Sequence, residues 1–201
     1  MNSTRQPDCK RRVGVFGGSF NPIHLAHTQI ALRTLETGLV DELWLLVSPQ
    51  NPLKRDANLL PDELRLRMAK AATADYPTIH VSDFELSLPR PSYMVNTLLA
   101  LEQAYPDRAF TLIIGADNWL RFPRWYRYQD ILARYPVIIY PREGYPIQET
   151  SLPSQATYLQ MPLLNISATQ IRQALQDHRD TSAWLHPDVA QILKQQPPHP
   201  A

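Results

Sequence analysis

The chain contains few of the residues that would mark it as a disulfide-bonded, membrane-spanning or nucleic-acid-binding protein. Its 201 residues include a single cysteine, Cys9, which excludes an internal disulfide and a cysteine zinc cluster. No apolar run approaches the roughly 20 residues of a membrane-spanning helix, and the polar residues 1–12 lack the apolar core of a signal peptide. Lysine and arginine number 20 and aspartate and glutamate 19, so the basic excess of a non-specific nucleic-acid binder is missing. We therefore expect a soluble cytoplasmic protein that binds neither membranes nor nucleic acid.

The apolar content is sufficient for one hydrophobic core. At 201 residues and 44% hydrophobic composition, the sequence suits a single domain, which we expect over residues 12–195 with tails at 1–11 and 196–201. Strand patterns alternate with helix patterns along it, which predicts an α/β fold with a parallel sheet and helices on both faces. The expected strands are 12–16, 43–48, 79–81, 110–114 and 137–140, and the expected helices are 25–37, 62–74, 95–104, 167–176 and 187–195. Parallel sheets bind ligands beyond the carboxyl ends of their strands, so we expect a site there.

The segment 17–27, GGSFNPIHLAH, joins the first expected strand to the first expected helix. Gly17 and Gly18 let the backbone approach a ligand closely, and the helix start offers free N–H groups and the positive end of a dipole. His24 and His27 share one face of that start, from which both rings can donate hydrogen bonds to a phosphate. A plain strand-to-helix turn with one surface histidine and one packed histidine fits the spacing about as well.

A second polar cluster opens the helix expected at 167–176. Ser167 and Gln170 form a capping-box pattern, which a helix needs for purely structural reasons. Ser167, Thr169 and Arg172 are also the residue types that bind a polyphosphate, through hydroxyls, N–H groups and a charged fork. Arg172 opposes the helix dipole at this end, and a bound anion would explain its position.

Two further segments follow expected strands. Lys54, in the loop after the strand at 43–48, is suited to meet a phosphate, although a solvated basic loop is the commoner case. Asp117 follows the strand at 110–114, where a carboxylate suits a pair of ribose hydroxyls. Trp125 and Tyr126 can stack on a planar base or belong to an aromatic cluster under a loop, and we assign Trp119 to such packing.

Together these segments resemble the nucleotidylyltransferase superfamily. Residues 17–27 are similar to its G-x-F-x-P-x-H-x-G-H signature, and residues 166–172 are similar to its I-S-S-T-x-I-R signature. Residues 49–54, 92–98 and 114–126 resemble landmarks of one branch, the bacterial nicotinate mononucleotide adenylyltransferases. The landmarks follow the order of that family and extend over nearly the whole chain.

The resemblance implies a Rossmann-like fold and transfer of the adenylyl group of ATP to nicotinate mononucleotide in NAD biosynthesis, with nicotinate adenine dinucleotide and pyrophosphate as products. It implies Mg²⁺ held mainly by ATP phosphates and water, with no metal ligand from the protein. The catalytic residues would be His24, His27 and Arg172. The ATP site would comprise Gly17, Gly18, Ser19, Phe20, Gly115, Asp117, Ile166, Ser167, Thr169 and Arg172. The mononucleotide site would comprise Ser19, Lys54, Met94, Trp125 and Tyr126.

The sequence departs from the family pattern at five positions. Ala26 and Ala168 replace a small glycine and a small serine. Asn21 stands where this branch often has aspartate, which bears on how the water shell of the metal is held. Leu53 replaces a common histidine, and Met94 replaces a common threonine near the pyridine substituent, so the preference for the acid or the amide mononucleotide stays open. The alternatives are an adenylyltransferase for nicotinamide mononucleotide or phosphopantetheine, or a non-catalytic nucleotide-sensing module, and self-association also stays open.

Overall fold

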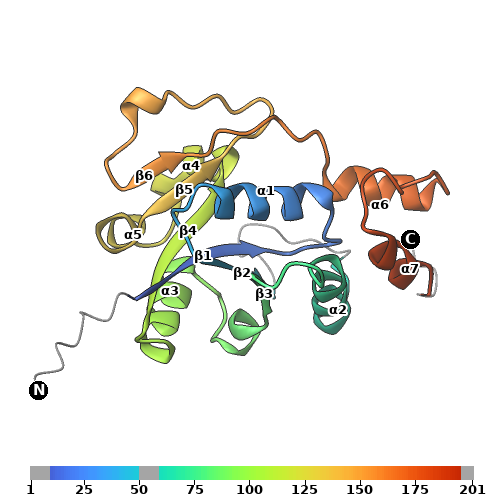
Figure 1. The fold of residues 1–201 in the computed structure, drawn as a ribbon, viewed down its shortest axis with the longest axis horizontal. Coiled ribbons are helices and arrows are strands. Elements are labelled where there is room, and N and C mark those ends of the chain that lie inside the picture. The colour runs from blue at the N-terminus through green and yellow to red at the C-terminus, as the bar shows by residue number, and fades with distance from the viewer. Residues whose placement is uncertain (1–9, 50–58, 196–201) are drawn as a thin grey trace, which may run out of the picture.

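The computed structural model describes residues 10–49 and 59–195, which form a six-stranded parallel sheet with helices on both faces (Figure 1). The strand order is β3-β2-β1-β4-β5-β6. From β1 in the middle of the sheet, the chain passes through β2 to β3 at one edge. It then crosses to β4 and continues through β5 to β6 at the other edge. This order is the doubly wound arrangement of Rossmann-like folds, and it confirms the expected α/β fold.

The boundaries of the expected elements agree with the structure to within two residues. The strands are β1 (Arg11–Gly18), β2 (Glu42–Val47), β3 (Ile79–Ser82), β4 (Arg108–Gly115), β5 (Val137–Tyr140) and β6 (Ala156–Tyr158). The helices are α1 (Leu25–Glu36), α2 (Asp62–Ala72), α3 (Met94–Ala104), α4 (Ala116–Arg121), α5 (Tyr128–Arg134), α6 (Ala168–Gln176) and α7 (Pro187–Lys194). Three short 3-10 helices are η1 (Phe84–Ser87), η2 (Phe122–Arg124) and η3 (Glu149–Ser151). The sequence patterns did not predict α4, α5, β6 or the 3-10 helices.

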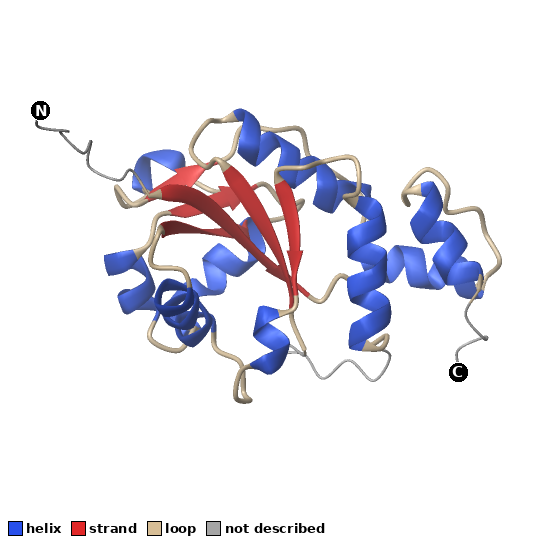
Figure 2. Ribbon diagram, turned by 60° about the horizontal axis from the view of Figure 1, so that its bottom comes forward, coloured by secondary structure: helices blue, strands red, loops and turns tan. Residues whose placement is uncertain are grey.

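Two apolar cores lie on the two faces of the sheet, as the alternation of side chains along each strand requires. In β2, which is buried along its whole length, Leu43, Leu45 and Val47 join the core to which α1, α2, α6 and α7 contribute. Trp44 and Leu46 join the other core, with side chains from α3, α4 and α5. Figure 2 shows the twist of the sheet between its helices. A strand covered on both faces reads as a continuous apolar run, which is why β2 was predicted.

The structure corrects the expected turn at Gly17 and Gly18. Both glycines are the last residues of β1, where they pair with Leu46 and Val47 of β2. The parallel ladder with β2 extends the strand, and the Ser48 N–H continues it by donating to the Gly18 carbonyl at 2.9 Å. The lack of a side chain at Gly17 matters, because a Cβ added there would lie 3.0 Å from the terminal methyl of Met94.

The middle of the sheet is its topological switch point. β1 pairs with β2 on one side and with β4 on the other, and the chain leaves these two central strands toward opposite edges of the sheet. Ligands of such sheets bind in the crevice outside the carboxyl ends at this point. No helix among the described residues is long and apolar enough to cross a membrane.

Removing a core side chain from β2 tests the packing of the sheet. Leu45 is fully buried, so we expect Leu45→Ala to lower the free energy of unfolding by about 2–5 kcal/mol, through lost apolar burial and an unfilled cavity. Leu39→Ala is the control, because Leu39 is 42% exposed and its loss should cost less than about 0.5 kcal/mol. Urea unfolding of both variants measures the difference, and equal losses would contradict the described core.

Candidate active site

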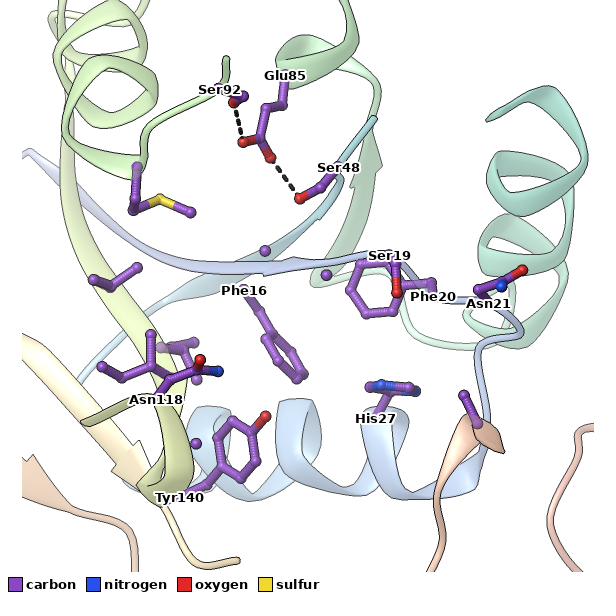
Figure 3. A pocket seen from close by; sticks show the side chains of 18 of the residues that line it. Phe16, Ser19, Phe20, Asn21, His27, Ser48, Glu85, Ser92, Asn118 and Tyr140 are labelled. Atoms are coloured by element: carbon purple, nitrogen blue, oxygen red, sulfur yellow. Dashed lines mark hydrogen bonds between the residues drawn. The ribbon is translucent and has the colours of Figure 1, made fainter. Parts of the chain in front are cut away.

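A cavity of about 510 Å³ opens at the carboxyl ends of β1 and β4. Its volume is within the range of small-molecule sites. The ends of both strands, the segment between β1 and α1, and the starts of α3 and α6 contribute to its walls. Figure 3 shows the site with Ser48, Glu85 and Ser92 on one side of β1, and His27 and Tyr140 on the other. The cavity therefore lies at the switch point and has a half on each face of the sheet.

His24 and His27 lie together at the start of α1. His24 is the buried N-cap residue, and its backbone N–H donates to Nδ1 of His27 at 3.2 Å. Because Nδ1 accepts this bond, the neutral His27 ring carries its proton on Nε2. The two ring centroids are 3.8 Å apart, and Phe20 packs edge-on against His27 at 5.0 Å. The structure thus fixes both the orientation and the tautomer of His27.

Both histidines are neutral at neutral pH. Burial lowers the pKa of His24 from 6.5 to about 3, and the positive charge of Arg142 adds to this effect. Burial also lowers the pKa of His27 well below its usual range, with smaller contributions from His24 and Arg142. Each ring can therefore donate a hydrogen bond to an anion but does not contribute a positive charge.

Arg172 connects the two polar clusters that the sequence analysis singled out. Its Nη1 donates to the backbone carbonyl of Asn21 at 2.8 Å, across 151 residues of sequence, and its Nη2 donates to Oγ1 of Thr169 at 3.3 Å. The predicted capping box is confirmed, because the Gln170 N–H donates to Ser167 Oγ and the Ser167 N–H donates to the Gln170 side chain. The start of α6 therefore lies directly against the segment that follows β1.

Most of the residues predicted to form the site line this one cavity. They are Gly17, Gly18, Ser19, Phe20, His24, His27, Met94, Gly115, Trp125, Tyr126, Ser167, Thr169 and Arg172. Ile166 and Asp117 do not line it: Ile166 packs against a core, and Oδ1 of Asp117 lies 3.6 Å from Nε of Arg142. Lys54 lies outside the described residues.

The expected N–H groups at the start of α1 are partly engaged by the protein. The Leu25 N–H donates to the Trp184 carbonyl at 2.9 Å, and the His27 N–H donates to the His24 carbonyl at 2.9 Å. Donors for an anion on this face therefore come mainly from side chains, which makes the two imidazole rings and Arg172 the groups to consider.

Glu85 is a buried carboxylate in the cavity wall that the sequence analysis missed. It accepts hydrogen bonds from Ser48 Oγ at 2.7 Å, from Ser92 Oγ and, at 3.5 Å, from Thr97 Oγ1. Ser92 and Thr97 follow Glu85 by seven and twelve residues, but Ser48 is 37 residues away, so local spacing reveals only part of the cluster. Glu85 joins the end of β2 to the start of α3, where Met94 enters the cavity.

Arg142 was also missed, although a signal for it existed. It comes two residues after β5, at the same carboxyl edge of the sheet as the other site residues, and its guanidinium carbon lies 5.4 Å from the ring centroid of Tyr140. Within the described residues, Arg142 Nε, Asp117 Oδ1 and His24 Nδ1 are buried without a hydrogen-bond partner. Arg142 Nε and Asp117 Oδ1 form an ion pair with each other at 3.6 Å. A buried polar atom without a hydrogen bond costs about 1–3 kcal/mol, so these atoms are suited to a polar ligand.

The aromatic residues divide as expected between packing and the cavity. Trp119 stacks on Phe122 at 5.4 Å and does not line the cavity, which confirms its packing role. Trp125 packs against Phe122 at 5.2 Å and also lines the cavity. Tyr126, 52% exposed, lies 4.7 Å from the ring of Tyr93. Trp125 is thus a partly fixed aromatic surface on the α3 side of the site.

Comparisons with known proteins agree with this arrangement. Residues 15–174 match the family described as cytidylyltransferase-like. The chain is 47% identical over 186 residues to a protein of Bacteroides thetaiotaomicron named probable nicotinate-nucleotide adenylyltransferase, with 92% of each chain covered. It is 41% identical to a protein of the same name from Porphyromonas gingivalis, over 86% of this chain and 88% of the other.

A solved structure has the same fold. The nicotinic acid mononucleotide adenylyltransferase of Plasmodium falciparum, complexed with NaAD, has a TM-score of 0.78 to this chain at 18% identity, covering 92% of this chain and 95% of that one. The fold and the match over residues 15–174 define a nucleotidyltransferase of the cytidylyltransferase-like class. Within that class, the chain belongs to the nicotinate-nucleotide adenylyltransferase family, as its curated relatives show. The resemblance found in the sequence is thereby confirmed.

The low pKa of His24 predicts a pH-dependent stability. Below pH 6.5 the unfolded chain binds a proton at His24, whereas the folded chain does not until about pH 3, so acidification favours unfolding. One such group gives a slope of up to about 1.4 kcal/mol per pH unit. We expect the free energy of unfolding of His24→Gln to fall less steeply than that of the unsubstituted protein between about pH 6 and pH 4.

Urea unfolding at each pH measures these slopes. The control is His178→Asn, which changes an exposed histidine with a positive φ of 53° that asparagine tolerates. Its slope should match that of the unsubstituted protein. If the slope for His24→Gln equalled the slopes of the unsubstituted protein and of His178→Asn, the folded His24 would bind its proton at an ordinary pH.

Proposed function

We propose that this chain transfers the adenylyl group of ATP to nicotinate mononucleotide, producing nicotinate adenine dinucleotide and pyrophosphate in NAD biosynthesis. The observation that carries the proposal is the Arg172–Asn21 hydrogen bond, which brings Arg172 into the cavity that His24 and His27 line. The curated relatives, at 41–47% identity and almost full coverage, bear the name of this activity.

The reaction needs no covalent enzyme intermediate. A phosphate oxygen of the mononucleotide attacks the α-phosphorus of ATP, a new P–O bond forms, and the bond to the β-phosphate oxygen breaks in line with release of pyrophosphate. Both reactants are anions, so orientation and stabilisation of negative charge account for the catalysis. No general base is required, because the attacking phosphate oxygen is already ionised.

On the α1 side of β1, the residues would bind the triphosphate. The Nε2–H of His27 would donate to an α-phosphate oxygen and stabilise the charge that develops there. His24, neutral and next to His27, would donate to a neighbouring phosphate oxygen. Arg172, with Ser167 and Thr169 beside it, would hold the leaving pyrophosphate through charge-assisted hydrogen bonds. Gly17 and Gly18 keep the strand end bare, so the nucleotide can approach the backbone.

On the α3 side, the residues would bind the acceptor. Trp125 would stack on the pyridine ring, with Met94 and Tyr126 beside its substituent. Ser19 would meet the mononucleotide phosphate, together with Lys54 from outside the described residues.

Asp117 and Gly115 would bind the ribose of the adenylate. In that case the carboxylate of Asp117 would have to exchange its contact with Arg142 for the ribose hydroxyls.

A divalent cation, Mg²⁺, would enter with ATP. Among the described residues no group of three or more histidine, cysteine, aspartate or glutamate side chains could hold a metal ion, and the unpaired nitrogens at the cavity suit phosphate oxygens. The residues present therefore fit an ion held by phosphates and water, as Mg²⁺ often is. Such an ion supplies charge neutralisation of the leaving pyrophosphate. A cytoplasmic location and self-association stay predictions.

An acceptor panel tests the proposed function. We expect the protein to release pyrophosphate from limiting ATP with nicotinate mononucleotide, more efficiently than with nicotinamide mononucleotide or phosphopantetheine, and chromatography should identify the dinucleotide product. Preference for another acceptor would reassign the substrate. ATP binding without pyrophosphate release with any acceptor would instead favour a nucleotide-sensing module.

Removing the imidazole of His27 tests the proposed chemical step. We expect His27→Ala to lower kcat by about 100- to 1000-fold with a much smaller change in the KM for ATP, as loss of a donor to transition-state charge does. Steady-state kinetics on protein with an unchanged circular dichroism spectrum is the measurement. Near-normal turnover in the folded variant would refute the role of His27.

A further inference from the structure

Arg65 is a fully buried arginine near the start of α2 that does not line the cavity. A guanidinium has five N–H donors, and each of them has an acceptor here. Nε donates to the Leu60 carbonyl at 2.9 Å, and Nη1 donates to the carbonyls of Ser19 and Ser48 at 2.6 and 2.8 Å. Nη2 donates to the Pro49 carbonyl at 3.5 Å and to the carboxylate of Asp62.

Two of these acceptors belong to segments that form one wall of the cavity. Ser19 follows β1, and Ser48 follows β2, and both residues line the cavity. Their carbonyl oxygens accept hydrogen bonds from Arg65, which lies behind that wall. These oxygens are therefore directed away from the cavity. Ser48 is held a second time by its side chain, which donates to Glu85.

The direction of these carbonyls matters for an anionic substrate. A carbonyl oxygen carries partial negative charge, and one facing a phosphate would repel it. The guanidinium draws these oxygens toward a buried positive charge. Its carboxylate partner Asp62 is 40% exposed and therefore partly screened by solvent. In this wall of the cavity, the carbonyl oxygens of Ser19 and Ser48 are therefore already engaged in hydrogen bonds with Arg65.

We propose that Arg65 is a positioning residue for the acceptor substrate: it turns the carbonyl oxygens of Ser19 and Ser48 away from the mononucleotide phosphate and fixes these two residues at the ends of β1 and β2. This proposal rests on the proposed function for the identity of the acceptor, but it requires only that the acceptor carry a phosphate. Lysine cannot replace arginine in this role, because its three donors lack the planar fork that reaches five acceptors.

The test compares two conservative substitutions on one helix. Arg65→Lys keeps the charge but not the fork, and Arg67→Lys makes the same change at an exposed position of α2. We expect Arg65→Lys to raise the KM for nicotinate mononucleotide about tenfold or more, the effect of losing one or two hydrogen bonds from a charged group, while the KM for ATP stays within about twofold. Arg67→Lys should match the unsubstituted protein in both constants.

A purely structural role for Arg65 would give a different result. General loosening would raise both KM values together and lower kcat and the melting temperature, and that pattern, or no change in either KM, would overturn the proposal. If the unsubstituted protein prefers another phosphate-bearing acceptor, the proposed function fails, but the same comparison is then made with that acceptor.

Asp62→Asn keeps the test decisive if Arg65→Lys does not fold. This change removes the charged partner of Arg65 at a half-exposed site and leaves the four carbonyl contacts in place. We expect a smaller rise, about two- to fivefold, in the acceptor KM with an unchanged KM for ATP, because Asp62 is half-exposed and solvent screens its charge. If Asp62→Asn left the KM for the acceptor and the KM for ATP unchanged, that result would count against a positioning role for Arg65.

Discussion

The hydrogen bond from Arg172 to the carbonyl of Asn21 joins the start of α6 to the segment after β1. Under the proposed function, each of these two segments alone would offer only part of a phosphate site. The bond is made to a backbone oxygen, so it depends on the path of the chain through residues 19–24 and not on the side chain at position 21. The side chain of Asn21 has a separate task, since its Oδ1 accepts the Leu60 N–H at 3.0 Å. Asparagine in place of the more usual aspartate therefore leaves this junction intact.

The positive charge of the cavity comes from its arginines and not from its histidines. Arg142 and Arg172 keep their charge at any physiological pH, whereas burial holds His24 and His27 in the neutral form. Under the proposed function, the arginines would attract the polyphosphate and the histidines would donate to its reacting oxygen. The carboxylate of Glu85 accepts hydrogen bonds from serine and threonine hydroxyls, which moderate its negative charge.

The sequence predicts the fold wherever apolar runs or helical periodicity are long enough. Strands such as β2 and β5 and helices such as α1 carry such patterns, but α4 and α5 have six and seven residues with 3-10 turns beside them, and β6 has three. The site was predicted where motifs are local, as at His24, His27 and Arg172. It was missed at Glu85, because only folding brings Ser48, 37 residues away, beside the Ser92 and Thr97 hydroxyls. Arg65 and Arg67 look alike in the sequence, and only burial distinguishes them.

The path of β1 between the two halves of the cavity has an evolutionary consequence. The side chains on the α3 side of β1, such as Met94 and Trp125, pack with the core under α3, whereas Phe16, Phe20 and Tyr140 pack with the core under α1. A substitution at a position such as Met94 therefore alters one wall without repacking the other. Under the proposed function, descendants of such a scaffold can change the molecule that receives the nucleotide while inheriting the ATP-binding residues unaltered.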